Sequence, residues 1–174
     1  MAKSRSAFSV QRSEQHAAHS TRHAARNGGM VDVSAKNITL RTAKASSSIV
    51  LGDEAFQTLT EGTCIKGDVL ATGKVAAIMA VKSTPAIIPM CHPIPIEAVD
   101  VEFKLNEPEK SVTTIVTVKS SGKTGVEMEA LVGASAASLT IYDMLKYKGR
   151  DMVVTETKLL EKTGGKSGSY KRPD

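Results

Sequence analysis

The stretch from Val99 to Lys119, VDVEFKLNEPEKSVTTIVTVK, decides the fold of this chain of 174 residues. Apolar and charged residues alternate over its first seven positions, which is typical of a strand that is buried on one face. Residues 106–110 have the composition of a turn, and the Val- and Thr-rich segment 112–119 predicts a second strand. The stretch is therefore predicted to form a β-hairpin.

Helices are predicted on both sides of this hairpin. Before it, residues 68–82, DVLATGKVAAIMAVK, gather Ala, Val, Ile and Met on one helical side, and residues 53–60 form a shorter candidate. After it, a long and mostly apolar segment runs from Thr124 to about Lys148. Thr124 and Glu127 have the spacing of a capping box, so we expect this helix to begin at Thr124.

Two further strands complete the predicted order. Residues 39–50 and 152–160 are compatible with β-structure, which gives the order β, α, β, β, α, β. This is the order of a ferredoxin-like sandwich, an α+β fold with an antiparallel sheet and helices packed on one face. The other face of such a sheet meets either water or a partner.

Charge divides the chain into two parts. The net charge is +5, and residues 1–29 hold five Lys or Arg against one Glu, so this segment carries +4 and the rest carries +1. We interpret residues 1–29 as a disordered basic leader, with an organellar transit peptide as the alternative. Residues 30–174 are predicted to be a single ferredoxin-like domain with a flexible C-terminal tail from about residue 163. The nearly neutral body argues against nucleic-acid binding.

The cysteines and the hydropathy pattern suggest a compartment. Cys64 and Cys91 lie 27 residues apart without a CxxC motif, so neither a disulfide framework nor a structural zinc site is predicted. No apolar run approaches the roughly 20 residues needed to cross a bilayer. No secretory signal is recognisable at the N-terminus. We therefore expect a cytoplasmic protein without a membrane partner.

Charged residues in the long predicted helix are candidates for chemistry. Glu129, Asp143 and Lys146 fall on one side of it, and Asp143 and Lys146 are neighbours at i,i+3. A carboxylate beside an ammonium group can transfer protons, although such a pair near a helix end is more often a solvated surface pair. Fourteen residues separate Glu129 from Asp143, roughly 21 Å of helix. One small substrate cannot reach both in one copy, so the sites are separate or a second subunit completes each one.

Two other segments have features of binding sites. Lys66 precedes Gly67-Asp68 at the start of one predicted helix, where free N–H groups and the helix dipole favour phosphate, and Lys82 lies near the end of that helix. Each lysine taken alone is more often a plain solvated one. The connection around His92 contains three prolines, which we expect to hold it extended and stiff. The run Gly133–Ser138 contains only Gly, Ala and Ser, and would allow close approach of another subunit or of a helix in the same domain.

Six ordered motifs together resemble the molybdenum cofactor biosynthesis protein C family, the cyclic pyranopterin monophosphate synthases. They are MVDVSAK (30–36), KGDV (66–69), IPMCHP (88–93), KTGVEMEAL (123–131), LTIYDM (139–144) and KTGGKSG (162–168). The resemblance covers about residues 30–172 in order and in spacing. Any one of these motifs alone would be weak.

The resemblance implies a lyase of the phosphorus–oxygen class. Its substrate would be (8S)-3′,8-cyclo-7,8-dihydroguanosine 5′-triphosphate, which it would convert to cyclic pyranopterin monophosphate with release of pyrophosphate, in molybdopterin biosynthesis. It also implies a homo-oligomer, a hexamer built as a trimer of dimers, with active sites at the dimer interfaces. No cofactor and no metal site are implied, which leaves open that magnesium travels with the triphosphate.

The resemblance also implies roles for individual residues. Asp143 would be the catalytic acid/base, Lys66 its proton-transfer partner, and Lys146 would orient Asp143 or meet phosphate. The residues expected to bind substrate are Lys82, His92 and Lys162 at the triphosphate end, together with Met90, Cys91, Glu127, Met128 and Glu129.

Two readings from other classes remain open at this point. The first is an RNA-binding module, which would stack bases on aromatic residues of the central strands; Phe103 alone is available for this. The second is an interaction subunit without activity, in which replacing Asp143 or Lys66 would leave turnover unchanged.

Overall fold

A computed structural model describes residues 29–173, and the predicted leader lies outside this range except for Gly29. The compact unit that contains the sheet begins at Val31. Its elements are β1 (Thr39–Val50), α2 (Asp53–Thr60), α3 (Val69–Lys82), α4 (Thr84–Ile87), β2 (Ala98–Asn106), β3 (Ser111–Gly122), α5 (Glu127–Leu145), β4 (Val153–Thr163) and β5 (Tyr170–Lys171). All six sequence-predicted strands and helices of the sandwich, and the short helix at 53–60, are present.

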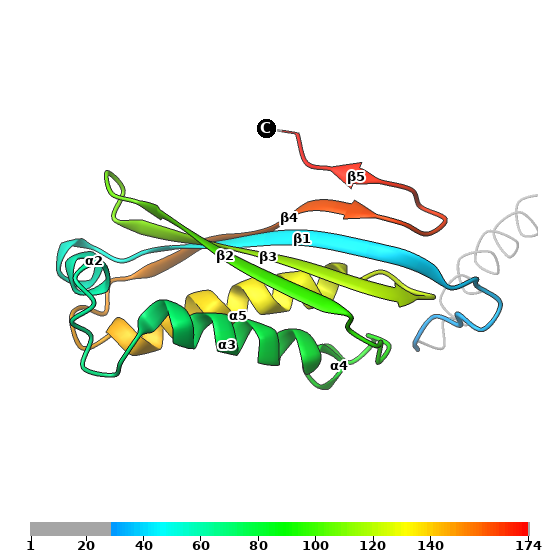
Figure 1. The fold of residues 1–174 in the computed structure, drawn as a ribbon, viewed down its shortest axis with the longest axis horizontal. Coiled ribbons are helices and arrows are strands. Elements are labelled where there is room, and N and C mark those ends of the chain that lie inside the picture. The colour runs from blue at the N-terminus through cyan, green and yellow to red at the C-terminus, as the bar shows by residue number, and fades with distance from the viewer. Residues whose placement is uncertain (1–28, 174) are drawn as a thin grey trace, which may run out of the picture. The chain divides into compact units, whose positions relative to one another are not determined.

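The strands form one antiparallel sheet in the order β2-β3-β1-β4-β5. The order of the first four, with β1 and β3 central, is that of a ferredoxin-like sandwich, so the predicted fold class is confirmed. Helices α3 and α5 lie side by side under one face of the sheet, and no helix among residues 29–173 covers the other face (Figure 1).

Small residues let the helical layer approach the sheet closely. Ala43 and Ala45 of β1 and Ala130, Ala134 and Ala137 of α5 are all fully buried in one apolar cluster. A methyl group on Gly133 would lie 2.7 Å from Val81 Cγ2 and 3.3 Å from the Ala77 carbonyl oxygen, both of α3. The run Gly133–Ser138 is therefore explained by packing within one domain.

The boundaries of α5 differ from the prediction. The helix begins at Glu127, and its N-cap residue is Val126, which provides no side-chain cap. The predicted capping box at Thr124 is wrong, because the Glu127 carboxylate turns back over Gly125 and faces Lys162. The helix ends at Leu145, a turn earlier than expected.

Two short elements were not predicted. Helix α4 follows directly after α3 and carries Pro85 in its first turn, where a proline is compatible with a helix. Strand β5 pairs with β4 through Glu161 opposite Lys171 and Lys162 opposite Tyr170. The flexibility expected of this tail stays a prediction.

Candidate active site

One end of α5 holds a three-residue charge cluster. The Asp143 carboxylate accepts a hydrogen bond from Lys66 Nζ at 2.9 Å and lies 2.6 Å from Lys146 Nζ. Lys66 Nζ also donates to the Asp143 carbonyl oxygen at 2.7 Å. Lys66 comes from a loop 77 residues earlier in the chain, so the fold, and not helical spacing alone, builds this cluster.

The loop that carries Lys66 is held against the end of α5 by its neighbours. Cys64 is buried and its Sγ donates to the Met144 carbonyl oxygen at 3.4 Å, while the Ile65 amide donates to the Tyr147 hydroxyl at 3.1 Å. Gly67 has a φ of +100°, which allows the chain to turn into Asp68, the N-cap of α3. These contacts fix where the Lys66 ammonium group points.

The two lysines change the acidity of Asp143. Hydrogen bonds from Lys146 and, second, from Lys66 lower the pKa of Asp143 from 3.8 to about 2. The carboxylate is ionised at neutral pH and is a weak base while both lysines hold it. The proton donors of the cluster at this pH are the two ammonium groups.

The other end of α5 holds a second group of predicted residues. Lys162 Nζ lies 3.7 Å from the Glu127 carboxylate and donates to Ser167 Oγ. Glu129 is only 3% exposed, and burial, with a smaller contribution from Glu127, raises its pKa. Burial and the nearby Glu129 charge also raise the pKa of the Cys91 thiol.

The remaining predicted residues are exposed or half-buried. Met90 and Lys82 are exposed, and Met128 and His92 are half-buried. His92 is close enough to Asp32 to contribute, as the smallest of its causes, to the lowered pKa of that carboxyl. Because the Asp143 and Glu129 groups stand roughly 21 Å apart on one rigid helix, a single chain does not gather all predicted residues into one pocket.

Comparison with known proteins identifies the family of this chain. The family model described as "MoaC family" matches residues 30–165, more than half of the chain. The chain belongs to the MoaC family. The resemblance stated from the six motifs is thereby confirmed.

Curated MoaC-family relatives carry the name cyclic pyranopterin monophosphate synthase. The protein of Staphylococcus haemolyticus (strain JCSC1435) is 50% identical over 84% of this chain and 93% of its own length. That of Staphylococcus carnosus (strain TM300) is 50% identical over 84% and 91%, and that of Staphylococcus aureus (strain JH9) 51% over 82% and 89%. The match to the MoaC family ends before β5, which begins at Tyr170.

The part of the chain that the structure describes has neither a metal-ligand cluster nor a helix that could span a membrane. Within residues 29–173, no group of three or more His, Cys, Asp or Glu is arranged to hold a metal ion. None of the helices there has the length and hydropathy needed to cross a bilayer. The expectation that this MoaC-family protein uses no cofactor stays a prediction.

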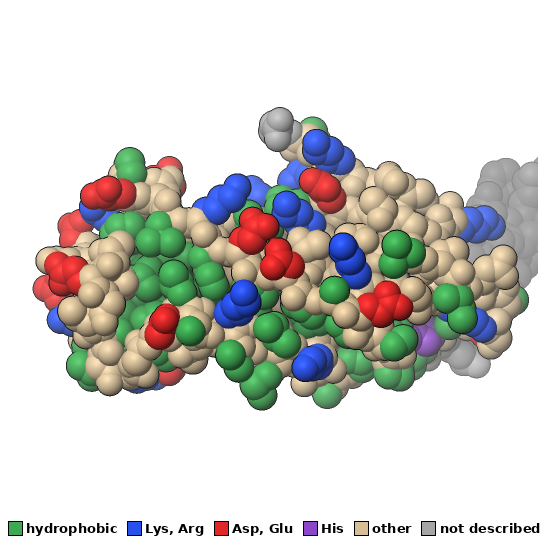
Figure 2. Space-filling model, in the orientation of Figure 1, with side chains coloured by type: hydrophobic (Ala, Val, Ile, Leu, Met, Phe, Trp, Pro, Cys, Tyr) green, Lys and Arg blue, Asp and Glu red, His purple; other side chains and the backbone are tan. Residues whose placement is uncertain are grey.

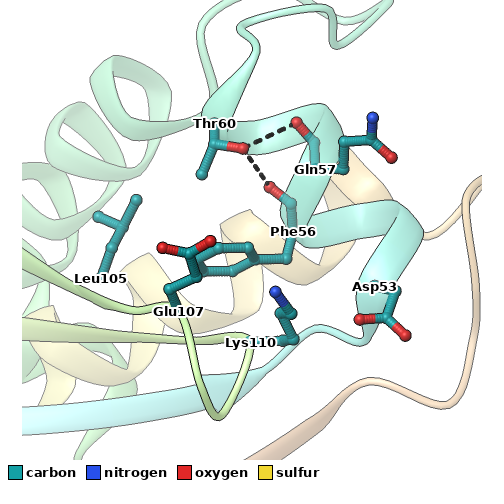
Figure 3. A pocket seen from close by; sticks show the side chains of 7 residues that line it. All are labelled: Asp53, Phe56, Gln57, Thr60, Leu105, Glu107 and Lys110. Atoms are coloured by element: carbon teal, nitrogen blue, oxygen red, sulfur yellow. Dashed lines mark hydrogen bonds between the residues drawn. The ribbon is translucent and has the colours of Figure 1, made fainter.

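A hollow of about 530 Å³ opens between α2 and the β2–β3 turn. Figure 3 shows the side chains of Phe56, Leu105, Glu107 and Lys110 that line this hollow. The Lys110 ammonium lies 5.3 Å from the centre of the Phe56 ring. From the side shown in Figure 2, apolar side chains gather at the end of the molecule where Figure 1 places α2. No predicted site residue lines this hollow, so we do not include it in the candidate site.

Sequence reasoning missed a group of cations beside Lys162 and Glu127. Lys36, Arg41 and Lys166 all line two hollows, of about 440 and 480 Å³. Arg41 gave a signal that could have been used, because it shares the inward face of β1 with buried Ala43 and Ala45. A charged residue at an inward position of a strand is uncommon, so its presence indicates a specific interaction of that side chain.

Proposed function

We propose that the protein is a cyclic pyranopterin monophosphate synthase. It converts (8S)-3′,8-cyclo-7,8-dihydroguanosine 5′-triphosphate to cyclic pyranopterin monophosphate and pyrophosphate. The single observation that carries this proposal is the cluster in which Asp143 joins Lys66 and Lys146, in a chain half identical to proteins named for this activity. The membership of the family supports an enzyme of the lyase class.

The cluster suits the proton transfers that this reaction needs. Ring opening and ring closure require protons to be taken and returned at several atoms. In the resting cluster the Lys66 ammonium is the proton donor and Asp143 orients it. Substrate that draws Lys146 toward a phosphate would remove the stronger cause of the lowered Asp143 pKa, so the carboxylate would become a better base.

The phosphate chemistry needs cations. When a substrate hydroxyl oxygen attacks the α-phosphorus, the bond to the β-phosphate oxygen breaks and pyrophosphate leaves with the electron pair. The hydroxyl proton goes to a base. We assign Lys82, Lys162 and His92 to the triphosphate end, and Met90, Cys91, Glu127, Met128 and Glu129 to contacts with the rest of the substrate. In this proposal lysines stabilise the departing oxygens without a protein-bound metal, and any magnesium would be carried by the triphosphate.

We further propose that two copies share each active site, in a hexamer that is a trimer of dimers. The support is the separation of the two groups on α5, which one substrate cannot bridge in one chain. A cytoplasmic location remains our expectation. Phe103 was the one aromatic residue available to stack an RNA base. Its ring packs toward the helices, 3.5 Å from where a methyl group on Gly73 would lie, so it does not support the RNA-binding alternative.

Turnover of the purified substrate tests the activity. We expect Lys66→Ala and Asp143→Asn each to lower turnover by about 100-fold or more, the usual effect of removing an acid/base group. Lys74→Ala, at an exposed lysine of α3, serves as the control. Near-normal rates in both site variants would reject the assignment and favour an interaction subunit without activity.

Subunit mixing tests the sharing of sites. Asp143→Asn changes the group at one end of α5, and Lys162→Ala changes the group at the other end. If each site takes one group from each copy, a dimer of one Asp143→Asn chain and one Lys162→Ala chain has one intact site and one site that lacks both groups. Random assembly of the two inactive variants should restore roughly a quarter of wild-type turnover, by the symmetry of a dimer with two equivalent sites. If the mixture stays inactive after both copies are shown to co-assemble, each site belongs to one chain.

A further inference from the structure

The segment from Cys64 to Gly67 forms a tight turn with Lys66 at its third position. The Gly67 amide donates to the Cys64 carbonyl oxygen at 3.0 Å, which closes a turn of four residues. This hydrogen bond sets the direction of the backbone at Lys66. It does not orient the turn relative to α5, so contacts with other segments must do this.

Three successive residues join the turn to the end of α5. Cys64 donates to a carbonyl oxygen in the last turn of the helix, and Lys66 donates to both the carboxylate and the carbonyl oxygen of Asp143. Between them, the Ile65 amide donates to the Tyr147 hydroxyl at 3.1 Å. The first and third contacts satisfy helix carbonyl groups that have no partner within the helix. The contact with Tyr147 has no such role and serves the turn alone.

Of these three contacts, the one with Tyr147 can be removed without changing the core or the charge cluster. Cys64 is part of a buried apolar cluster, and Lys66 carries the charge itself. Tyr147 follows the end of α5 and is 39% exposed, so loss of its hydroxyl leaves no buried cavity. The Ile65 side chain is 78% exposed, so its burial cannot hold the turn in place. The Tyr147 hydroxyl is therefore a specific tie at the residue next to Lys66.

We propose that Tyr147 is a positioning residue for Lys66. By accepting the hydrogen bond of the Ile65 amide, its hydroxyl sets the place at which the Lys66 ammonium group meets Asp143. The consequence for turnover rests on the proposed function, in which the Lys66 ammonium is the proton donor. Tyr147 lies outside the six motifs that carried the family resemblance.

Steady-state kinetics of Tyr147→Phe test this role, since the variant keeps the ring and loses only the hydroxyl. We expect kcat to fall roughly twofold to tenfold, the factor that corresponds to the net contribution of one hydrogen bond. KM should stay unchanged, because Lys66 is not assigned to the triphosphate. Tyr142→Phe is the matched control: this hydroxyl also lies at the end of α5, but it donates to the Arg150 carbonyl oxygen at 3.2 Å. It should leave kcat and KM as in the wild type.

A second background shows whether the effect passes through Lys66. If Tyr147 acts by placing this ammonium group, Tyr147→Phe should cause no further loss of kcat in the Lys66→Ala protein. A residue that only stabilises the fold would lower kcat by the same factor in both backgrounds.

The Asp143 carboxyl gives a readout that needs no turnover. The hydrogen bond from Lys66 is the second cause of its lowered pKa. Its carbon-13 titration midpoint should therefore rise above about 2 in Tyr147→Phe and stay near 2 in Tyr142→Phe.

Four results would each overturn the proposal. They are a wild-type kcat in Tyr147→Phe, equal losses in the two phenylalanine variants, a further loss in the Lys66→Ala background, and an unchanged Asp143 midpoint in Tyr147→Phe. Failure of the proposed function would look different. The wild-type protein would then lack turnover, while the Asp143 midpoint would still respond to Tyr147→Phe and not to Tyr142→Phe.

Discussion

The contact between α3 and α5 predicts that two helical glycines respond to alanine in opposite ways. Gly133→Ala places its methyl 2.7 Å from Val81 Cγ2, a branched side chain that is 1% exposed and cannot move freely. Gly73→Ala, in the facing helix, places its methyl 3.5 Å from the Phe103 ring and 3.7 Å from Ile141, which are ordinary contacts. Both changes replace a helical glycine and should gain about 0.5–1 kcal/mol of helix propensity.

The difference between the two variants isolates the packing term. Overpacking of a close-packed core costs about 1–3 kcal/mol, so Gly133→Ala should be less stable than Gly73→Ala by that amount. For a domain of this size, 1 kcal/mol shifts the melting temperature by about 2–4 °C. We therefore expect a gap of roughly 5 °C, with Gly73→Ala at or above the wild type.

Thermal unfolding followed by circular dichroism measures this gap. All three proteins should be compared at one concentration, because self-association would make the melting temperature depend on it. A Gly133→Ala protein that melts at or above Gly73→Ala would refute the argument. It would mean that α5 does not approach α3 as closely as the structure describes.

Two pH-dependent results are also expected. A carbon-13 NMR titration of the Asp143 carboxyl should give a midpoint near 2, and a Lys66→Ala/Lys146→Ala variant should return it toward 3.8; an unchanged midpoint would contradict the ion pairs. The stability that these pairs contribute is present above the unfolded value of 3.8 and is lost as pH falls toward 2, and it is small because Asp143 is exposed. Glu129 has the opposite effect, because burial raises its pKa. Its contribution to the stability of the fold is complete below the unfolded pKa of 4.5 and is lost as pH rises through the pKa of the folded state. Glu129→Gln should therefore gain stability relative to the wild type between pH 4 and pH 7 in chemical denaturation, and a constant difference across that range would count against a buried, neutral-preferring carboxyl.

The periodic parts of the fold could be predicted from sequence, since period-2 and period-3.6 patterns report burial directly. The hairpin at 99–119 and the helix at 69–82 agree with their predictions to within about a turn. The start of α5 could not be predicted, because Thr124 and Glu127 match a capping pattern locally while Lys162, from β4, attracts the Glu127 carboxylate. Local sequence did not contain that distant contact.

The candidate site divides in the same way. The Asp143–Lys146 pair follows from helical spacing, whereas the contact between Lys66 and Asp143 depends on a loop folding across 77 positions of chain. Family resemblance, and not periodicity, named Lys66 as the partner. Arg41 was missed because a single cation in a strand carries no motif.

The packing that α5 needs also limits how this protein can bring its residues together. The alanine and glycine residues of α5 pack closely against α3 and the sheet along most of the helix. Bending α5 to bring Glu129 nearer to Asp143 would therefore disrupt the core. No small conformational change within one chain can shorten a separation of roughly 21 Å that is set by helical rise. A substrate that needs both the Asp143 cluster and the Lys162 group must therefore find them on two chains. The same rigidity would hold the two groups in register across an interface, since each copy presents them at a fixed spacing.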